Sequence, residues 1–189
     1  PNLYYVTVKF AGDDLIDRIG FRKIEARGKD LFLNNRKIKI IGVCRHEIHP
    51  DWGYAMPFEL VKKDIDIIRD MNCNAVRAAH YPHGQKTIDY CDELGLLFWE
   101  EIPLWGNLAS WADSLKEESF IERILLMFKE MMARDMNHPS LIFWGLYNEI
   151  DTALPQTRSL TERMVKMVRA EDSSRLISYA TCSIHHNVP

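Results

Sequence analysis

The sequence has few cysteines, and their spacing matches no metal or redox motif. None forms a C-x-x-C pair, which argues against a zinc ribbon or a thioredoxin-type site. They fall in predicted strands or near predicted helix ends, so we expect buried free thiols. Free thiols favour a reducing compartment such as the cytoplasm. The cysteines are Cys44, Cys73, Cys91 and Cys182.

A long apolar run and an excess of one charge sign are also missing. No apolar stretch approaches the roughly 20 residues that span a bilayer, and the formal net charge is only −3. We therefore expect neither a membrane nor nucleic acid as a partner. The chain begins with Pro1 rather than methionine, so we expect the native N-terminus to lie upstream.

What the sequence does contain is a regular alternation of strand-like and helix-like segments. Its 189 residues suffice for one domain with a sizeable core. Short apolar runs alternate with amphipathic segments from about residue 38 onward, which predicts a parallel sheet covered by helices. The predicted strands are 38–43, 75–78, 96–99, 141–146 and 176–180, and the predicted helices lie near 57–71, 85–93, 120–132 and 160–168.

Polar or titratable side chains follow four successive predicted strands. They are His46, His80, Glu101 and Glu149. Active sites of α/β barrels are built from residues at the carboxyl ends of the strands. An open dinucleotide-binding sheet would need a glycine-rich turn after its first strand, and GVCRHEIHP is not one. The pattern therefore predicts a partial (β/α)8 TIM barrel containing about the first five strands.

The segment before the barrel is predicted to be β-structure. Residues 4–10 alternate as a half-buried strand does. Asn34 and Asn35 suit a tight hairpin turn between Leu31–Leu33 and Lys37–Ile40.

Four motifs in order resemble successive blocks of glycoside hydrolase family 2, the β-galactosidase and β-glucuronidase group. They are GVCRHEIHP, NAVRAAHYP, CDELGLLFWEEIP and NHPSLIFWGLYNE, and the last resembles the acid/base signature of the family. The resemblance implies that residues 1–24 are the C-terminal strands and linker of an immunoglobulin-like β-sandwich domain. Residues 25–189 would then be the N-terminal part of a TIM-barrel glycosidase domain.

The resemblance also implies an activity, which is retaining hydrolysis of a β-linked oligosaccharide or glycoside of the β-galactoside or β-glucuronide type. Glu149 matches the general acid/base, and Asn148 matches the residue that hydrogen-bonds the 2-hydroxyl of the sugar. The nucleophilic glutamate of the family lies on the seventh strand. We therefore expect the nucleophile beyond residue 189 and expect this fragment to be inactive.

Other positions carried over by the resemblance line the substrate pocket. Arg77 and His80 match positions beside the reacting sugar, His46 matches a pocket-lining position, and Glu101 occupies the carboxylate position that ends the third strand. The Trp105 ring is a further candidate for stacking on a sugar. Metal-dependent β-galactosidases carry a magnesium ligand just after this strand, whereas residues 103–106 offer no oxygen ligand here. No metal or other cofactor is therefore expected.

The sequence leaves more than one role open for the two strand-end glutamates, Glu149 and Glu101. A general acid must begin protonated, so its pKa must be raised by burial or by a neighbouring carboxylate. Glu149 follows Phe143 and Trp144 on an apolar strand, a setting that could supply the burial. Glu101 could itself be the nucleophile, since neighbouring strands lie about 4.8 Å apart, or it could pair with Arg77 as a strand-end ion pair.

Other classes of function also compete with a glycosidase. A non-catalytic carbohydrate-binding or interaction module is one. A metal-dependent hydrolase with His46, His49, His80 and Glu101 as ligands is another. Whatever the function, the open edges of a five-stranded barrel piece predict self-association.

Overall fold

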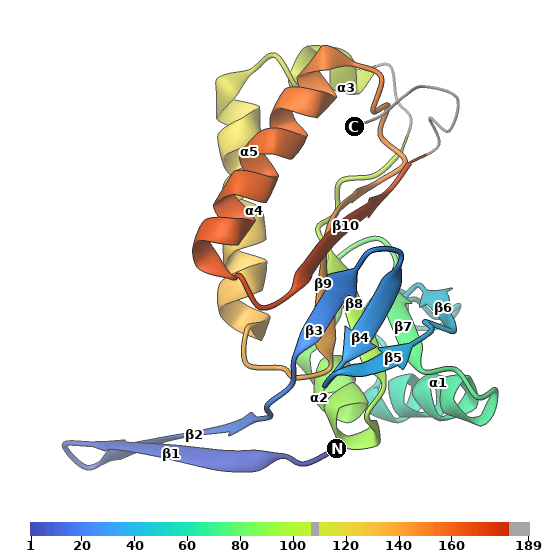
Figure 1. Cartoon of the computed structure of the whole chain (residues 1–189), viewed down its shortest axis with the longest axis vertical. Coiled ribbons are helices and arrows are strands. Elements are labelled where there is room, and N and C mark those ends of the chain that lie inside the picture. The colour runs from blue at the N-terminus through green and yellow to red at the C-terminus, as the bar shows by residue number, and fades with distance from the viewer. Residues whose placement is uncertain (107–109, 182–189) are drawn as a thin grey trace.

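A computed structural model shows a five-stranded parallel sheet with the strand order β10-β9-β8-β7-β6 (Figure 1). The structure describes residues 1–106 and 110–181. Sequential neighbours pair in parallel throughout, which is the arrangement of a TIM barrel, but the barrel is not closed. The strands are β6 (Gly42–Arg45), β7 (Ala75–Ala78), β8 (Leu97–Glu101), β9 (Leu141–Asn148) and β10 (Leu176–Ala180).

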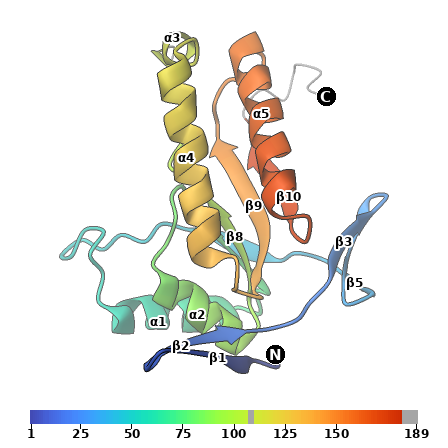
Figure 2. The same ribbon diagram turned by 90° about the vertical axis from the view of Figure 1, so that its left-hand side faces the viewer.

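Figure 2 shows the long helices as two pairs, the first two side by side and the last two side by side. Pro57 precedes the first, a left-handed Gly95 with φ 72° ends the second, and Pro155 opens the last, as the distribution of proline and glycine at helix ends predicts. No helix within the described ranges is long and apolar enough to cross a membrane. The helices are α1 (Phe58–Asp70), α2 (Gln85–Leu94), α3 (Ser110–Ser114), α4 (Glu118–Asp135) and α5 (Pro155–Glu171).

The main core fills the space between the helices and the sheet. Trp144 of β9 packs against Phe128 of α4 with the ring centroids 6.3 Å apart. Both belong to one fully buried cluster that also contains Phe98 of β8 and Leu160 of α5. The packing follows from the sequence, because alternate residues of a strand face opposite sides and apolar residues on a helix recur about every 3.6 positions.

A small antiparallel sheet packs against the other side of the strands. Its strands are β3 (Ile24–Arg27), β4 (Asp30–Leu33) and β5 (Arg36–Ile38). Leu33 pairs with Arg36, and the two intervening asparagines have φ of 50° and 64°, which confirms the predicted tight turn. Ile24 of this sheet forms a second buried cluster with Ala75, Leu97 and Ile142. Ala75 and Leu97 are the first residues of β7 and β8, so the small sheet covers the amino-terminal end of the barrel strands.

The predicted strand over residues 38–43 is wrong, because the structure divides it between two sheets. Ile38 ends β5 of the small sheet, and Gly42 begins β6 of the barrel. The chain changes sheets at Ile41, whose N–H donates to the side chain of Asn74. Gly42 then approaches β7 so closely that a Cβ would lie 2.3 Å from the Ala75 carbonyl oxygen. A continuous apolar pattern cannot reveal such a change of partner.

The first two strands form a separate antiparallel hairpin that extends away from the barrel strands (Figure 1). They are β1 (Tyr4–Phe10) and β2 (Asp13–Ile19). Tyr5 and Phe10 are 76% and 80% exposed, so the alternating pattern of this hairpin has no apolar partner in the described structure. Assignment of residues 1–24 to a β-sandwich domain stays a prediction.

The concave face of the parallel sheet holds an apolar hollow of about 240 Å³. Trp99 and Phe143 line it with their rings 5.2 Å apart. Within the described residues, β6 and β10 have no further strand beside them. Cys44, Cys73 and Cys91 are free thiols as expected, but only Cys91 of these three is buried, since Cys73 is half-buried and Cys44 is exposed. Cys182 lies outside the described residues.

Candidate active site

A fixed ion pair joins the carboxyl ends of β7 and β8. The guanidinium of Arg77 donates from Nε to Oε2 of Glu101 at 3.1 Å, and from Nη2 to Oε1 and Oε2 at 3.0 and 2.8 Å. The Glu101 side chain is fully buried. A planar guanidinium that meets a carboxylate at both oxygens fixes its orientation as well as its charge. The strand-end ion pair between Arg77 and Glu101, which was one of the alternatives for Glu101, is therefore present.

His80 and Asn148 extend this pair into a four-residue cluster. His80 Nδ1 lies 2.5 Å from Glu101 Oε1, and Arg77 Nη2 donates to Asn148 Oδ1 at 2.9 Å. Arginine has only donors, so the amide oxygen of Asn148 must face it and the amide NH2 group must face away. The structure thus brings together four of the six predicted site residues.

Glu149 follows Asn148 directly at the carboxyl rim of the sheet. Its backbone is left-handed, with φ 56°, and its N–H donates to the Ala180 carbonyl at 3.0 Å. The other described non-glycine residues with positive φ are Ala11 and three asparagines, in positions such as hairpin turns and a helix end. A glutamate held in this conformation at a sheet rim has the kind of backbone strain that gathers at functional sites.

The surroundings of Glu149 differ from the expectation. The sequence predicts that Phe143 and Trp144 bury this carboxyl, whereas Glu149 is exposed. Phe143 instead packs against Trp99, and Trp144 lies on the opposite face, where its indole N–H donates to Asp172 at 2.8 Å. Phe143 and Trp144 face opposite sides of the sheet, and the Glu149 side chain is left exposed in the part of the chain that the structure describes.

The two predicted histidines of the first strand-to-helix loop behave differently. The His46 ring meets the His80 ring edge-on at 5.1 Å, so His46 adjoins the cluster. His49 Nδ1 accepts the Asp51 N–H within its own loop at 3.2 Å. The structure therefore does not gather His46, His49, His80 and Glu101 as metal ligands, since no such group is found among the described residues.

Gly145 makes room for the cluster from the neighbouring strand, a role that is not among the predictions from the sequence. It pairs with Glu101 across β8 and β9. A Cβ at this position would lie 2.4 Å from Trp99 Nε1 and 2.5 Å from Glu101 Cβ. Trp99 in turn stacks under the guanidinium of Arg77, 4.9 Å from its ring centroid. In the sequence, the glycine within the apolar segment FWGLYNE is the signal that could have indicated this close approach.

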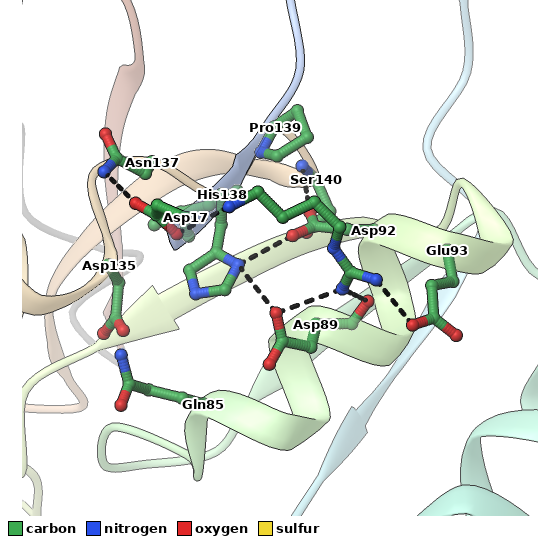
Figure 3. A network of polar contacts seen from close by, with 12 residues as sticks. Asp17, Gln85, Asp89, Asp92, Glu93, Asp135, Asn137, His138, Pro139 and Ser140 are labelled. Carbon is green, nitrogen blue, oxygen red and sulfur yellow. Dashed lines mark hydrogen bonds and ion pairs between the residues drawn. The ribbon is translucent and has the colours of Figure 1, made fainter. Parts of the chain in front are cut away.

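A second polar network lies at the amino-terminal end of the sheet (Figure 3). His138 Nδ1 lies 2.7 Å from Asp92 Oδ2, the Ser140 N–H donates to Asp92 Oδ1 at 2.8 Å, and Arg18 donates to Asp89 Oδ1 at 3.1 Å. Asp89, Asp92 and His138 are the one group with ligand-like spacing in the described part of the chain. Since the oxygens already accept these donors, we assign the network a structural role. It joins β2, α2 and the turn before β9.

A parallel βα sheet with an Asn-Glu pair ending its fourth strand has the arrangement of a barrel glycosidase. The family profile described as "Glycosyl hydrolases family 2, TIM barrel domain" matches residues 24–188. The chain belongs to glycoside hydrolase family 2.

Two relatives illustrate the similarity in sequence. A β-galactosidase from Thermoanaerobacterium thermosulfurigenes is 38% identical over 154 residues, which are 77% of this chain and 20% of the relative. A β-glucuronidase from Bacteroides fragilis is 32% identical over 149 residues, which are 78% and 21% of the two chains. The matched part of this chain thus spans about a fifth of the length of these relatives.

Solved structures show the same likeness. A family 2 β-galacturonidase from Eisenbergiella tayi, bound to galacturonate, superimposes with a TM-score of 0.90 at 37% identity, over 96% of this chain and 32% of that one. The β-glucuronidase of Parabacteroides merdae gives a TM-score of 0.83 at 29% identity, over 100% and 24% of the two chains.

Proposed function

We propose that Glu149 is the general acid/base of a retaining β-glycosidase that acts on β-galactoside or β-glucuronide-type substrates. The observation that carries the proposal is the hydrogen-bond chain from Glu101 through Arg77 to Asn148, which ends one residue before Glu149. The substrate class is supported by the names of the relatives, which are β-galactosidases, β-glucuronidases and a β-galacturonidase.

Asn148 has a defined part in this proposal. Because Arg77 engages its amide oxygen, the amide NH2 group donates to an oxygen of the bound sugar, which we assign to the 2-hydroxyl. Hydrogen bonds to this hydroxyl strengthen in the transition state of glycoside hydrolysis.

Glu101 acts as an anchor and not as the nucleophile. Both of its oxygens are engaged, one by Arg77 and His80 and the other by Arg77. A carboxylate that accepts several charged hydrogen bonds is a weaker nucleophile, because attack would require those bonds to be given up. His80 and His46 line the sugar site beside it.

The nucleophile is a second carboxylate, on a strand outside the five described here. Retaining enzymes need their two carboxyl groups about 5–5.5 Å apart. The nucleophile attacks the anomeric carbon as the bond to the leaving oxygen breaks, and Glu149 gives that oxygen its proton. Glu149 then accepts a proton from water as the water oxygen displaces the nucleophile. The 189-residue chain alone is accordingly inactive.

The test is a comparison of leaving groups in the whole enzyme that carries this chain. Glu149→Gln should slow hydrolysis of an alkyl β-glycoside by about 10²- to 10⁴-fold, the usual contribution of a general acid. Formation of the glycosyl-enzyme from a dinitrophenyl glycoside should change far less, because that leaving group needs no proton.

The matched control is Glu130→Gln, which removes an exposed carboxylate from α4 and should leave both substrates unaffected. Equal loss on both substrates in Glu149→Gln would contradict the acid/base role. Turnover of nitrophenyl β-glycosides by the isolated chain, abolished by Glu149→Gln, would contradict the missing nucleophile.

A further inference from the structure

Residues 46–55 form a loop after β6 that carries His46 to the candidate active site. Two hydrogen bonds join this loop to another part of the chain that the structure describes, and both end on the side chain of Glu47. Oε2 of Glu47 accepts the Gly84 N–H at 3.2 Å, and Oε1 accepts the Thr87 hydroxyl at 3.1 Å. Glu47 therefore connects the loop after β6 to the first turn of α2.

The Glu47 carboxylate lies where a negative charge is stabilised. Gly84 is the N-cap residue of α2, and the free N–H groups at the start of a helix carry a partial positive charge. Arg45 Nη1 lies 3.7 Å from Glu47 Oε2, and Arg45 is held in turn by Asp64 of α1 at 3.0 Å. The Glu47 side chain is only 13% exposed, so water does not readily replace a hydrogen-bond partner that is lost here.

The His46 side chain has no comparable polar anchor. It is exposed, and its ring forms no hydrogen bond within the part of the chain that the structure describes. It meets the His80 ring edge-on at 5.1 Å and the Tyr81 ring at 6.1 Å. His80 itself is fixed, because its Nδ1 lies 2.5 Å from Glu101 Oε1. The place of His46 beside the cluster therefore depends on its backbone, and the next residue along that backbone is Glu47.

We propose that Glu47 is a positioning residue, which joins the loop after β6 to the start of α2 and so holds His46 against His80. Glu47 acts through His46 and not on the sugar itself. The proposal rests on the function proposed above, because it takes both histidines as residues of the sugar site. The ion pair between Arg77 and Glu101 belongs to β7 and β8, so it should survive the loss of Glu47.

A double-variant cycle in the whole enzyme measures whether Glu47 acts through His46. Glu47→Ala should lower kcat/KM on the order of tenfold, but less than about twofold when His46→Ala is already present, because residues that act together are not additive. Glu47→Gln should restore most of the loss, since its amide can accept the Gly84 N–H and donate to the Thr87 hydroxyl. The control is Asp51→Ala, because Asp51 carries the same charge in the same loop with its side chain 82% exposed. It should leave kcat/KM unchanged.

Crystal structures of the same variants give a readout that does not depend on activity. In Glu47→Ala the His46 ring should leave the His80 ring, while the hydrogen bonds that Glu101 accepts should keep their lengths. If Glu47→Ala fails to fold, Thr87→Val decides, because valine keeps the shape of threonine and removes only the hydroxyl that donates to Glu47. In that variant kcat/KM should fall roughly threefold, the scale of one hydrogen bond, and only while His46 is present.

An equal loss of kcat/KM with and without His46 overturns the proposal, because Glu47 would then act on stability or through another group. A Glu47→Gln variant as slow as Glu47→Ala overturns it too, and so does a His46 ring that stays against His80 when the hydrogen bonds to Glu47 are gone. A failure of the glycosidase assignment is distinguishable from these results. The wild-type enzyme would then hydrolyse no β-glycoside, whereas the crystal structures would still decide whether Glu47 places His46.

Discussion

Replacement of Gly145 by alanine tests how tightly the cluster is built. Gly145 lies opposite Glu101 in the pairing of β8 and β9. The added methyl carbon would stand 2.4 Å from Trp99 Nε1, 2.5 Å from Glu101 Cβ and 3.0 Å from the Glu100 carbonyl oxygen. The contact with Glu101 involves its Cβ, which moves only with the backbone of β8, so the overlap cannot be relieved by rotating a flexible side chain.

The size of the displacement sets the expected effect. Carbon atoms in contact lie about 3.5–4.0 Å apart, so the methyl group must push Glu101 away by about 1 Å. The hydrogen bonds from Arg77 Nη2 to Glu101 are 2.8 and 3.0 Å long and do not survive such a shift. Overpacking of this kind costs about 1–3 kcal/mol of unfolding free energy, and a 1 Å misplacement near the reacting groups lowers turnover about 10²-fold.

The assays are urea denaturation and kcat/KM of the whole enzyme. The matched control is Gly84→Ala, because a Cβ there meets only Glu47 Oε1 at an ordinary 3.6 Å. We expect Gly145→Ala to lose both stability and turnover and Gly84→Ala to lose little of either. Native stability and turnover in Gly145→Ala would refute the reasoning, because β8 and β9 would then be free to separate without consequence.

Three further predictions follow from the same contacts. Arg77→Lys keeps the positive charge but loses the two-point contact with Glu101 and the hydrogen bond to Asn148. We therefore expect kcat/KM to fall although the net charge is unchanged. Unaltered kinetics would count against the fixed cluster. Burial acts to lower the pKa of His138, but the hydrogen bond and the charge of Asp92 raise it above its usual value, so its contribution to stability is fully present below about pH 6.5. That contribution is lost as the pH rises through the folded-state pKa, and denaturation curves should show this slope in the wild type and lose it in His138→Gln. The edges of β6 and β10 predict that the 189-residue chain self-associates, and a monodisperse monomer in light scattering would contradict this.

Much of the parallel sheet could be predicted because its signals are local. The strands β7 and β10 match the predicted ranges to the residue. The strands β8 and β9 end two residues later than predicted, and β8 also begins one residue later. Gly95 ends α2 as predicted. Each of these signals is carried by the segment itself, as a buried apolar run or a helix-ending glycine.

The parts that could not be predicted depend on which segments meet. The change of sheets between Ile38 and Gly42 leaves no mark in an apolar run. The exposure of Glu149 depends on where Trp144 points, and the spacing role of Gly145 depends on its partner in β8.

Azide rescue of the whole enzyme carrying Glu149→Ala tests the acid/base role of Glu149 most directly. Azide needs no general base, so it can take the place of water in attacking the glycosyl-enzyme. We expect azide to restore turnover of a dinitrophenyl β-glycoside and to give the β-glycosyl azide as the product. No rescue, or an α-glycosyl azide, would contradict the assignment of Glu149 as the acid/base of a retaining enzyme.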